Sequence, residues 1–219
     1  MKRYFPFAII LAVLVLAVAG GAIFFRHRNQ PPLLPPKSAL GKPGAEPPHL
    51  RGGPGAAALL EEFGDFECLP CSVLYPILKK AEADYGQHLC VIFRQYSLSQ
   101  HRHAPDAARA TEAAGLQNRF WEMHDLLYEN RLAWLSAADT RAALEIYAAQ
   151  LSLDVERFKK DMDSEAVNAR LAADNERRIS LGLDRTPAVF VNGERITARP
   201  ITIEILHTAI DTAIADKSK

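Results

Sequence analysis

Hydrophobic and polar positions follow different periods along this chain, and each change of period marks an expected element. Residues 57–66 predict a short strand that ends in a turn. The apolar residues over 74–85 then follow helical spacing, so we predict a helix there, which Pro76 should kink. The continuous apolar run over residues 89–93 is typical of a strand that is covered on both faces.

The long segment over residues 104–181 contains no strand-like run. It is rich in alanine, leucine, glutamate and arginine, and it carries helix-start signals at Ser136 and Ser164. We therefore predict three to five helices, which should end near Gly182.

The C-terminal part returns to strands and closes with a helix. Residues 188–191 and 194–197 flank an Asn192-Gly193 pair, which predicts a β-hairpin with a type I′ turn. Pro200 is expected to open the last helix, because proline is favoured in a first helical turn. The apolar stripe of that helix should contain Ile201, Ile205, Ala209 and Ala213.

The predicted order is strand, helix, strand, a block of helices, two strands and a helix. This order indicates an α/β domain of about 160 residues, enough to bury a core without disulfide support. Of the chain's 219 residues, 48% are apolar and 24% charged, which excludes a wholly disordered chain, a collagen and a multi-span membrane protein. Lys and Arg number 26, as do Asp and Glu, so nothing in the charge balance suggests a nucleic-acid partner.

The N-terminal residues 1–28 predict a membrane anchor. An uncharged stretch of 21 residues runs over positions 5–25, and as a helix it would span roughly 30 Å, the thickness of a bilayer core. A signal peptide cleaved after Ala19 is the alternative, although the apolar run continues past that site. Both interpretations place the rest of the chain outside the cytoplasm.

Residues 29–56 are expected to be a linker. Residues 29–55 contain eight of the chain's 14 prolines and five of its 12 glycines, and no apolar period that could be buried. Such a segment would hold a domain, here residues 57–219, away from a membrane.

Cys68 and Cys71 form a Cys-x-x-Cys pair between the first strand and the first helix. Unpaired N–H groups and the dipole at a helix N-terminus stabilise an anion, which lowers a thiol pKa from about 8.5 to about 3.5–7.5. We expect Cys68 to be the exposed, attacking thiol at the N-cap. Cys71, on the apolar stripe, should be the buried thiol that resolves the mixed disulfide. Pro70 has no N–H to donate to Cys68, which favours a less extreme pKa.

Other interpretations of this pair stay open. It could be half of a zinc site, or part of a module that holds copper or zinc together with a histidine. His101, His103 and His124 are available as further ligands. The third cysteine, Cys90, lies in the apolar run over residues 89–93 and is expected to be a buried small hydrophobe.

Two further positions favour redox chemistry. Glu62 lies six residues before Cys68 and points beneath the helix if the strand alternates, where a carboxylate can move the proton of the resolving thiol. An exposed glutamate at the strand end is the alternative. Pro187 directly precedes a strand, so it marks the strand's start and favours a cis bond after Thr186.

Several blocks in order carry a family resemblance. FGDFECLPC, FRQYSLSQHRHAPDAARATEAAG, FWEMHDLLYE and TPAVFVNG resemble the DsbA-like, thioredoxin-fold disulfide oxidoreductases of bacterial envelopes, over about residues 57–215. The resemblance implies a thioredoxin fold with strand-helix-strand and strand-strand-helix halves and a helical insertion at about 104–181. It implies that Cys68 and Cys71 are the redox pair, with Glu62 as the acidic residue beneath it. It also places Thr186, Pro187, Leu69 and Pro70 at the surface that contacts the client.

The resemblance implies an enzyme that exchanges disulfides with extracytoplasmic client proteins and needs no cofactor beyond its own redox-active disulfide. A disulfide donor would be regenerated by a quinone-linked membrane oxidase, and a reductase or isomerase by a membrane thiol donor. Leu69-Pro70 between the cysteines and threonine before the proline depart from the strongest oxidants of the family. The overall resemblance still favours the oxidase direction slightly. Trp121 and His124 are expected to be packing residues.

Overall fold

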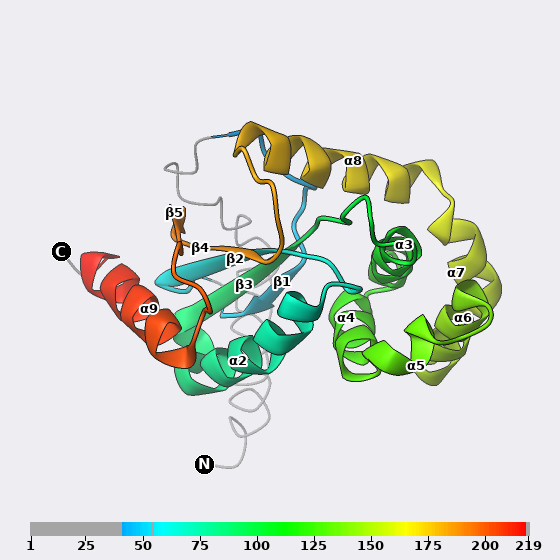
Figure 1. The fold of residues 1–219 in the computed structure, drawn as a ribbon, viewed down its shortest axis with the longest axis horizontal. Helices are drawn as coiled ribbons and strands as arrows, with labels where there is room; N and C mark the ends of the chain where they lie inside the picture. Colours follow the sequence, from blue (N-terminus) through cyan, green and yellow to red (C-terminus); the bar gives the residue numbers. More distant parts are fainter. Residues whose placement is uncertain (1–40, 54, 218–219) are drawn as a thin grey trace, which may run out of the picture. The chain divides into compact units, whose positions relative to one another are not determined.

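A mixed sheet lies at the centre of the part of the chain that the computed structural model describes, residues 41–53 and 55–217 (Figure 1). One pair of neighbouring strands is parallel and is connected by a helix, whereas the other three pairings are antiparallel. In spatial order, the strands are β1 (Leu50–Gly52), β3 (Leu89–Gln95), β2 (Ala58–Gly64), β4 (Ala188–Val191) and β5 (Glu194–Arg195).

Helices cover both faces of the sheet and extend beyond one edge of it (Figure 1). In chain order, they are α2 (Leu69–Tyr85), the 3-10 turn η1 (Gly86–His88), α3 (Ala104–Gly115), α4 (Phe120–Glu129), α5 (Arg131–Leu135), α6 (Thr140–Gln150), α7 (Val155–Met162), α8 (Glu165–Ser180) and α9 (Ile203–Lys217). Helix α2 continues through Pro76. None of the described helices is long and apolar enough to cross a membrane. The anchor predicted at residues 5–25 lies outside the described residues.

Strand β2 divides its side chains between the two faces of the sheet. Leu60 and Glu62 lie on the face covered by α2 and α9, where Leu60 packs with apolar residues of both helices. Glu61 and Phe63 lie on the opposite face, where Glu61 meets Arg177 of α8. The alternation that was assumed for Glu62 is therefore confirmed.

The helical insertion is confirmed, but it contains six helices, α3 to α8, rather than three to five. The five-residue helix α5 is too short to show an apolar period, so it was missed. Ser164 caps α8 as predicted, accepting a hydrogen bond from the N–H of Val167 at 3.2 Å. The cap of α6 is Asp139, not Ser136.

The C-terminal hairpin is confirmed, and both turn residues have positive φ, 46° for Asn192 and 87° for Gly193, as a type I′ turn requires. The last helix begins at Ile203 rather than Pro200, because Ile201 packs into the core before the helix starts. Its buried stripe is also shifted.

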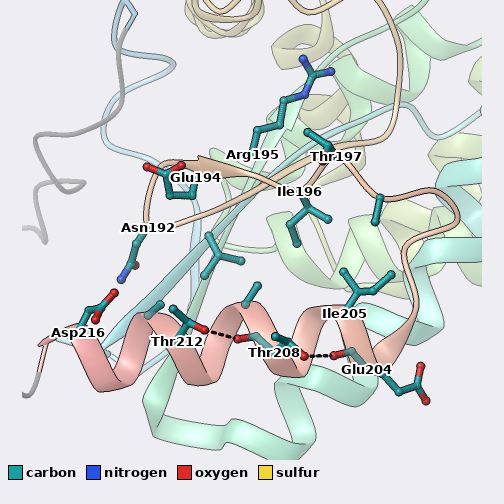
Figure 2. Close-up of a pocket in the computed structure, with 14 residues that line it drawn as sticks. Asn192, Glu194, Arg195, Ile196, Thr197, Glu204, Ile205, Thr208, Thr212 and Asp216 are labelled. Carbon is teal, nitrogen blue, oxygen red and sulfur yellow. Dashed lines mark hydrogen bonds between the residues drawn. The ribbon is translucent and has the colours of Figure 1, made fainter.

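The buried residues of α9 are Leu206, Ile210 and Ala213, of which only Ala213 was predicted. Ile205 and Ala209 instead line an open groove of about 660 Å³ between this helix and the hairpin. Figure 2 shows Ile205 on the helix side of this groove and Ile196 on the hairpin side.

The predicted boundary between linker and domain, at residue 57, is too late. Strand β1 lies within the supposed linker and pairs with β3. Further upstream, the N–H of Ala45 donates to Asp174 Oδ1 at 2.8 Å, and the Ala45 carbonyl accepts from Arg94 Nη1 at 2.7 Å. The proline and glycine content did not indicate that this part of the linker is ordered, because contacts with distant residues hold it in place and it has no periodicity of its own.

The same side chains belong to a buried ion cluster beneath α8. Glu61 accepts from Arg94 Nε at 2.8 Å and from Arg177 Nη2 at 2.6 Å. Asp174 accepts from Arg94 Nη1 at 3.2 Å, and Arg177 also donates to the carbonyl of Lys42 at 2.8 Å. The cluster thus fastens residues 42–45 to the sheet.

Candidate active site

The Cys-x-x-Cys pair lies where β2 leads into α2. Cys68 is the N-cap residue, with φ −70° and ψ 122°, and Leu69 and Pro70 form the start of the helix. No side chain caps this N-terminus. The positive end of a 17-residue helix is therefore directed at the Cys68 sulfur, as predicted.

Cys68 is covered more than predicted, with only 4% of its surface exposed. The cover comes from the loop before β4, where the Thr186 carbonyl oxygen lies 3.8 Å from Cys68 Sγ. Hydrogen bonding from the Cys71 side chain, helped by the Cys71 N–H, lowers the pKa of Cys68 to about 6, although burial opposes this shift. At neutral pH the Cys68 sulfur is therefore largely a thiolate.

Cys71 has the opposite character. It is fully buried on the inner face of α2, and both cysteines carry free thiols in this structure. Burial raises the pKa of Cys71 well above its ordinary value, and the nearby Glu62 acts in the same direction. Cys68 is thus ionised and able to attack a disulfide, whereas Cys71 stays protonated unless a base accepts its proton.

Glu62 is buried on the face of the sheet covered by α2, between Phe93 of β3 and Val189 of β4. Its Oε1 has no hydrogen-bond partner among the described residues. Burial, with a contribution from the charge of Glu82, raises the pKa of Glu62 to about 8. A carboxyl group of that kind can both accept and return a proton near neutral pH.

The Thr186–Pro187 peptide bond is cis, as the sequence suggested, and both residues lie beside the pair. Thr186 is buried and leads directly into β4. Leu69 is 61% exposed and Val73 is 59% exposed at the start of α2. Beside them lies an apolar groove of about 390 Å³, lined by Leu69, Pro70, Val73, Leu74, Ile77, Pro187, Arg199, Pro200 and Ile201.

The loop before Cys68 is fastened by residues that the sequence analysis missed. Asp65 accepts from the N–H of Glu67 at 2.8 Å, and its other oxygen lies 2.8 Å from His101 Nδ1. The Glu67 carboxylate accepts from the N–H of Ala104 at the start of α3, and the Glu67 carbonyl accepts from Arg131. The order Asp-x-Glu-Cys at the end of a strand was the available signal.

His103, His124 and Trp121 are mainly structural. His103 Nδ1 lies 2.7 Å from the Thr140 hydroxyl. His124 is buried among aromatic rings with Nδ1 2.9 Å from Asp125, and burial lowers its pKa to about 4. Its Nε2 and the Trp121 Nε1 have no hydrogen-bond partner among the described residues, although both side chains pack against aromatic rings as predicted.

Cys90 is 1% exposed, which confirms it as a buried hydrophobe. Within residues 41–53 and 55–217, no three His, Cys, Asp or Glu side chains are grouped so that they could hold a metal ion. The alternative in which Cys68 and Cys71 bind copper or zinc therefore finds no third ligand in this part of the chain.

The thioredoxin family profile matches residues 45–212, well over half of the chain. The chain belongs to the thioredoxin family. Among solved structures, it is similar to α-DsbA1 of Wolbachia pipientis, with a TM-score of 0.66 and 18% identity over 80% of this chain and 95% of that one. It is also similar to oxidised BdbD of Bacillus subtilis, with a TM-score of 0.63 and 21% identity over 80% of this chain and 98% of that one. These likenesses show a DsbA-like thioredoxin fold.

Curated relatives that are similar in sequence to this chain are named as antiporters and not as oxidoreductases. A protein of Mycolicibacterium gilvum called Na⁺/H⁺ antiporter NhaA 1 is 38% identical over 195 residues, which is 85% of this chain but 30% of the relative. For the NhaA antiporter of Herminiimonas arsenicoxydans, 38% identity extends over 68% of this chain and 23% of the relative. The chain thus spans less than a third of the length of these relatives.

Proposed function

We propose that this protein is a thiol-disulfide oxidoreductase that acts on extracytoplasmic proteins through Cys68 and Cys71. The contrast between the two sulfurs carries this proposal: Cys68 has a pKa lowered to about 6 at a helix N-terminus, and Cys71 is buried with a raised pKa. The fold shared with DsbA and BdbD structures supports it.

The reaction can be written with its atoms and electrons balanced. In the oxidising direction, a client thiolate attacks Cys68 Sγ of the Cys68–Cys71 disulfide, and Cys71 leaves as a thiolate that takes up a proton. A second client thiolate then attacks the client sulfur of the mixed disulfide, and Cys68 leaves as a thiolate. The client has lost two electrons and the cysteine pair has gained them. The reducing direction is the reverse, with Cys71 as the resolving thiol.

We propose the oxidising direction, with a moderate driving force. A stabilised Cys68 thiolate favours the reduced pair and thus makes the disulfide a better oxidant. A pKa of about 6 is a modest stabilisation. The reduction potential should therefore fall between about −120 mV, typical of strong oxidants, and about −270 mV, typical of thioredoxin. Equilibration with glutathione measures it, and a value at the thioredoxin end would reverse the direction.

Clients would bind over the apolar groove beside the pair. Leu69 and Pro70 of α2 and Pro187 of the cis-proline loop line it, so an extended client segment with an apolar side chain would lie directly next to Cys68. Thr186 would face the same segment. Three of the four predicted client-contacting residues, Leu69, Pro70 and Pro187, line this groove, and the buried Thr186 directly precedes Pro187.

The anchor and the partner belong to the same proposal. Residues 5–25 would tether the domain to the cytoplasmic membrane, with the domain in the periplasm, and a quinone-linked membrane oxidase would regenerate the disulfide. Secretion after cleavage is the alternative outcome. Alkaline extraction of membranes separates the two, because a tethered protein stays in the pellet and a cleaved one does not.

Trapping of mixed disulfides tests the activity. A Cys71→Ser variant should accumulate covalent complexes with client proteins, because the resolving thiol is absent. Thiol reductants should cleave these complexes. A Cys68→Ser variant should accumulate none, and Cys90→Ser is the matched control that leaves trapping by Cys71→Ser unchanged. If Cys71→Ser traps no client under oxidising conditions, the proposed function fails.

A further inference from the structure

Arg51 projects from β1 onto the face of the sheet that carries Glu62. In the strand register Arg51 is paired with Val91 of β3, which is paired in turn with Leu60 of β2. Paired positions share a face, and Leu60 and Glu62 are two residues apart, so Arg51 and Glu62 are on the same side. Arg51 lies in the segment that was predicted to be a linker, and no role was predicted for it.

The guanidinium of Arg51 is held on three sides. Its Nη2 donates to Glu82 Oε1 at 2.7 Å, its Nη1 donates to Asp125 Oδ1 at 2.8 Å, and its Cζ lies 4.2 Å from the ring centroid of Trp121. The side chains of Arg51, Glu82 and Asp125 are 19%, 17% and 23% exposed. This ion pair thus lies at the border between the core and solvent.

Glu82 connects this border to the redox pair through α2. It follows Cys71 by about three helical turns, so both residues point to the same side of the helix, toward the sheet. Glu62 lies beneath that side, and the charges of both Glu82 and Arg51 act on its carboxyl group, in opposite directions.

Neighbouring contacts link the ion pair to Glu62 along α4. The rings of Trp121 and His124 are 5.0 Å apart, and His124 is 4.7 Å from Phe93, the cross-strand neighbour of Glu62. Five buried polar atoms in this region have no hydrogen-bond partner among the described residues: Arg51 Nε, Glu62 Oε1, Trp121 Nε1, His124 Nε2 and Tyr128 Oη. Trp121, His124 and Phe93 thus form a continuous series of contacts from Arg51 to the strand neighbour of Glu62.

We propose that the Arg51–Glu82 ion pair is a charge regulator of Glu62, and through it controls proton transfer to and from Cys71. The inference rests on the proposed function, since it concerns the same reaction. Arg51 is a positioning residue here, because it acts through Glu62 and touches neither sulfur. The titratable or charged groups that act on Glu62 or lie close to it are Cys68, Cys71 and Glu82 of α2, Arg51 of β1, and His124, Asp125 and Tyr128 of α4.

In the reducing direction the controlled step is resolution of the mixed disulfide by Cys71, and in the oxidising direction it is the reverse, in which the departing Cys71 thiolate takes its proton from Glu62. Cys71 passes its proton to the Glu62 carboxylate and attacks Cys68 Sγ. The bond between Cys68 and the client sulfur breaks, and the client leaves as a thiolate that takes up a proton from solvent. This step alone oxidises the Cys71 sulfur and reduces the client sulfur by one electron each, and the two exchange steps of the reducing direction together move two electrons from the cysteine pair to the client. The rate of this step follows the fraction of Glu62 that is ionised.

Two substitutions break the same ion pair but should move this rate in opposite directions. Arg51→Met removes a positive charge, so the pH midpoint of client release should rise by about one unit, and release at pH 7 should slow about tenfold. Glu82→Gln removes a negative charge, so the midpoint should fall by about one unit. Lys80→Met, which breaks an exposed ion pair to Asp84 on the same helix, is the control and should leave the midpoint in place.

Stopped-flow measurement of the release of a quenched fluorescent peptide from its mixed disulfide, from pH 5 to 10, gives the pH midpoint of the release rate. Thiolate absorbance gives the ionisation of Cys68 separately. We expect the Cys68 titration to be unchanged in all three variants, and both shifts to vanish in a Glu62→Gln background. Shifts in the same direction, or shifts that persist without Glu62, would overturn the inference. If the wild-type protein releases no peptide, the proposed function fails, and the titration of Glu62 by carbon NMR in the same variants still decides the charge regulation.

Discussion

Glu62→Gln should stabilise the reduced protein at neutral pH, by an amount that depends on pH. Glu62 is buried and its pKa is raised from 4.5 to about 8. Between these two values the folded protein keeps a proton that the unfolded chain releases, so Glu62 makes folding progressively less favourable as the pH rises. At pH 7 the difference between the unfolded and folded pKa of Glu62 lowers the free energy of unfolding by about 3 kcal/mol. Glutamine would remove this penalty because it never ionises.

Urea denaturation of the reduced protein at a series of pH values measures this effect. The gain in free energy of unfolding should be close to zero at pH 4, should grow through neutral pH and should level off above pH 8. Glu194→Gln, at an exposed position of β5, is the control and should show no such growth. A difference between Glu62→Gln and wild type that stays constant from pH 4 to pH 8 would refute the reasoning from burial.

Three other predictions concern the pair, the ion cluster and a helix cap. Alkylation by iodoacetamide should modify Cys68 with a rate midpoint near pH 6 and leave Cys71 unmodified by mass spectrometry, and a midpoint above pH 8 would contradict the lowered pKa. Arg177→Met should lower the free energy of unfolding by about 3–5 kcal/mol, because it leaves Glu61 buried with part of its charge unpaired, and a loss below about 1 kcal/mol would count against the cluster. Ser164→Ala should cost about 1 kcal/mol in the same assay, with Ser164→Thr losing less.

Local rules predicted the parts of the site that depend on a few consecutive residues. The N-cap position of Cys68 follows from a strand that meets a helix, the burial of Cys71 follows from helical spacing, and the direction of Glu62 follows from strand alternation. Each of these needs only the period of one element.

Features that depend on residues far apart in the sequence were not predicted. Cys68 was expected to be exposed, but Thr186, which is 118 positions later, covers it. Arg51 was assigned to a linker, since a three-residue strand has no period of its own and is held by pairing with β3. Tertiary contacts determine both the burial of Cys68 and the place of Arg51 in a strand, and the amino-acid composition does not indicate such contacts.

The adjacent residues Glu61 and Glu62 have environments that differ because a strand sends successive side chains to opposite faces. Glu61 is an ionic clamp for residues 42–45 through Arg94 and Arg177, and Glu62 lies under the redox pair. A single-residue insertion in β2 before them would move Glu61 to the position of Glu62 and Leu60 to that of Glu61, so the clamp would lose its anion while a carboxylate would remain beneath the buried thiol. The register of this seven-residue strand therefore constrains the anchoring of residues 42–45 more strictly than it constrains the carboxylate beneath the cysteine pair.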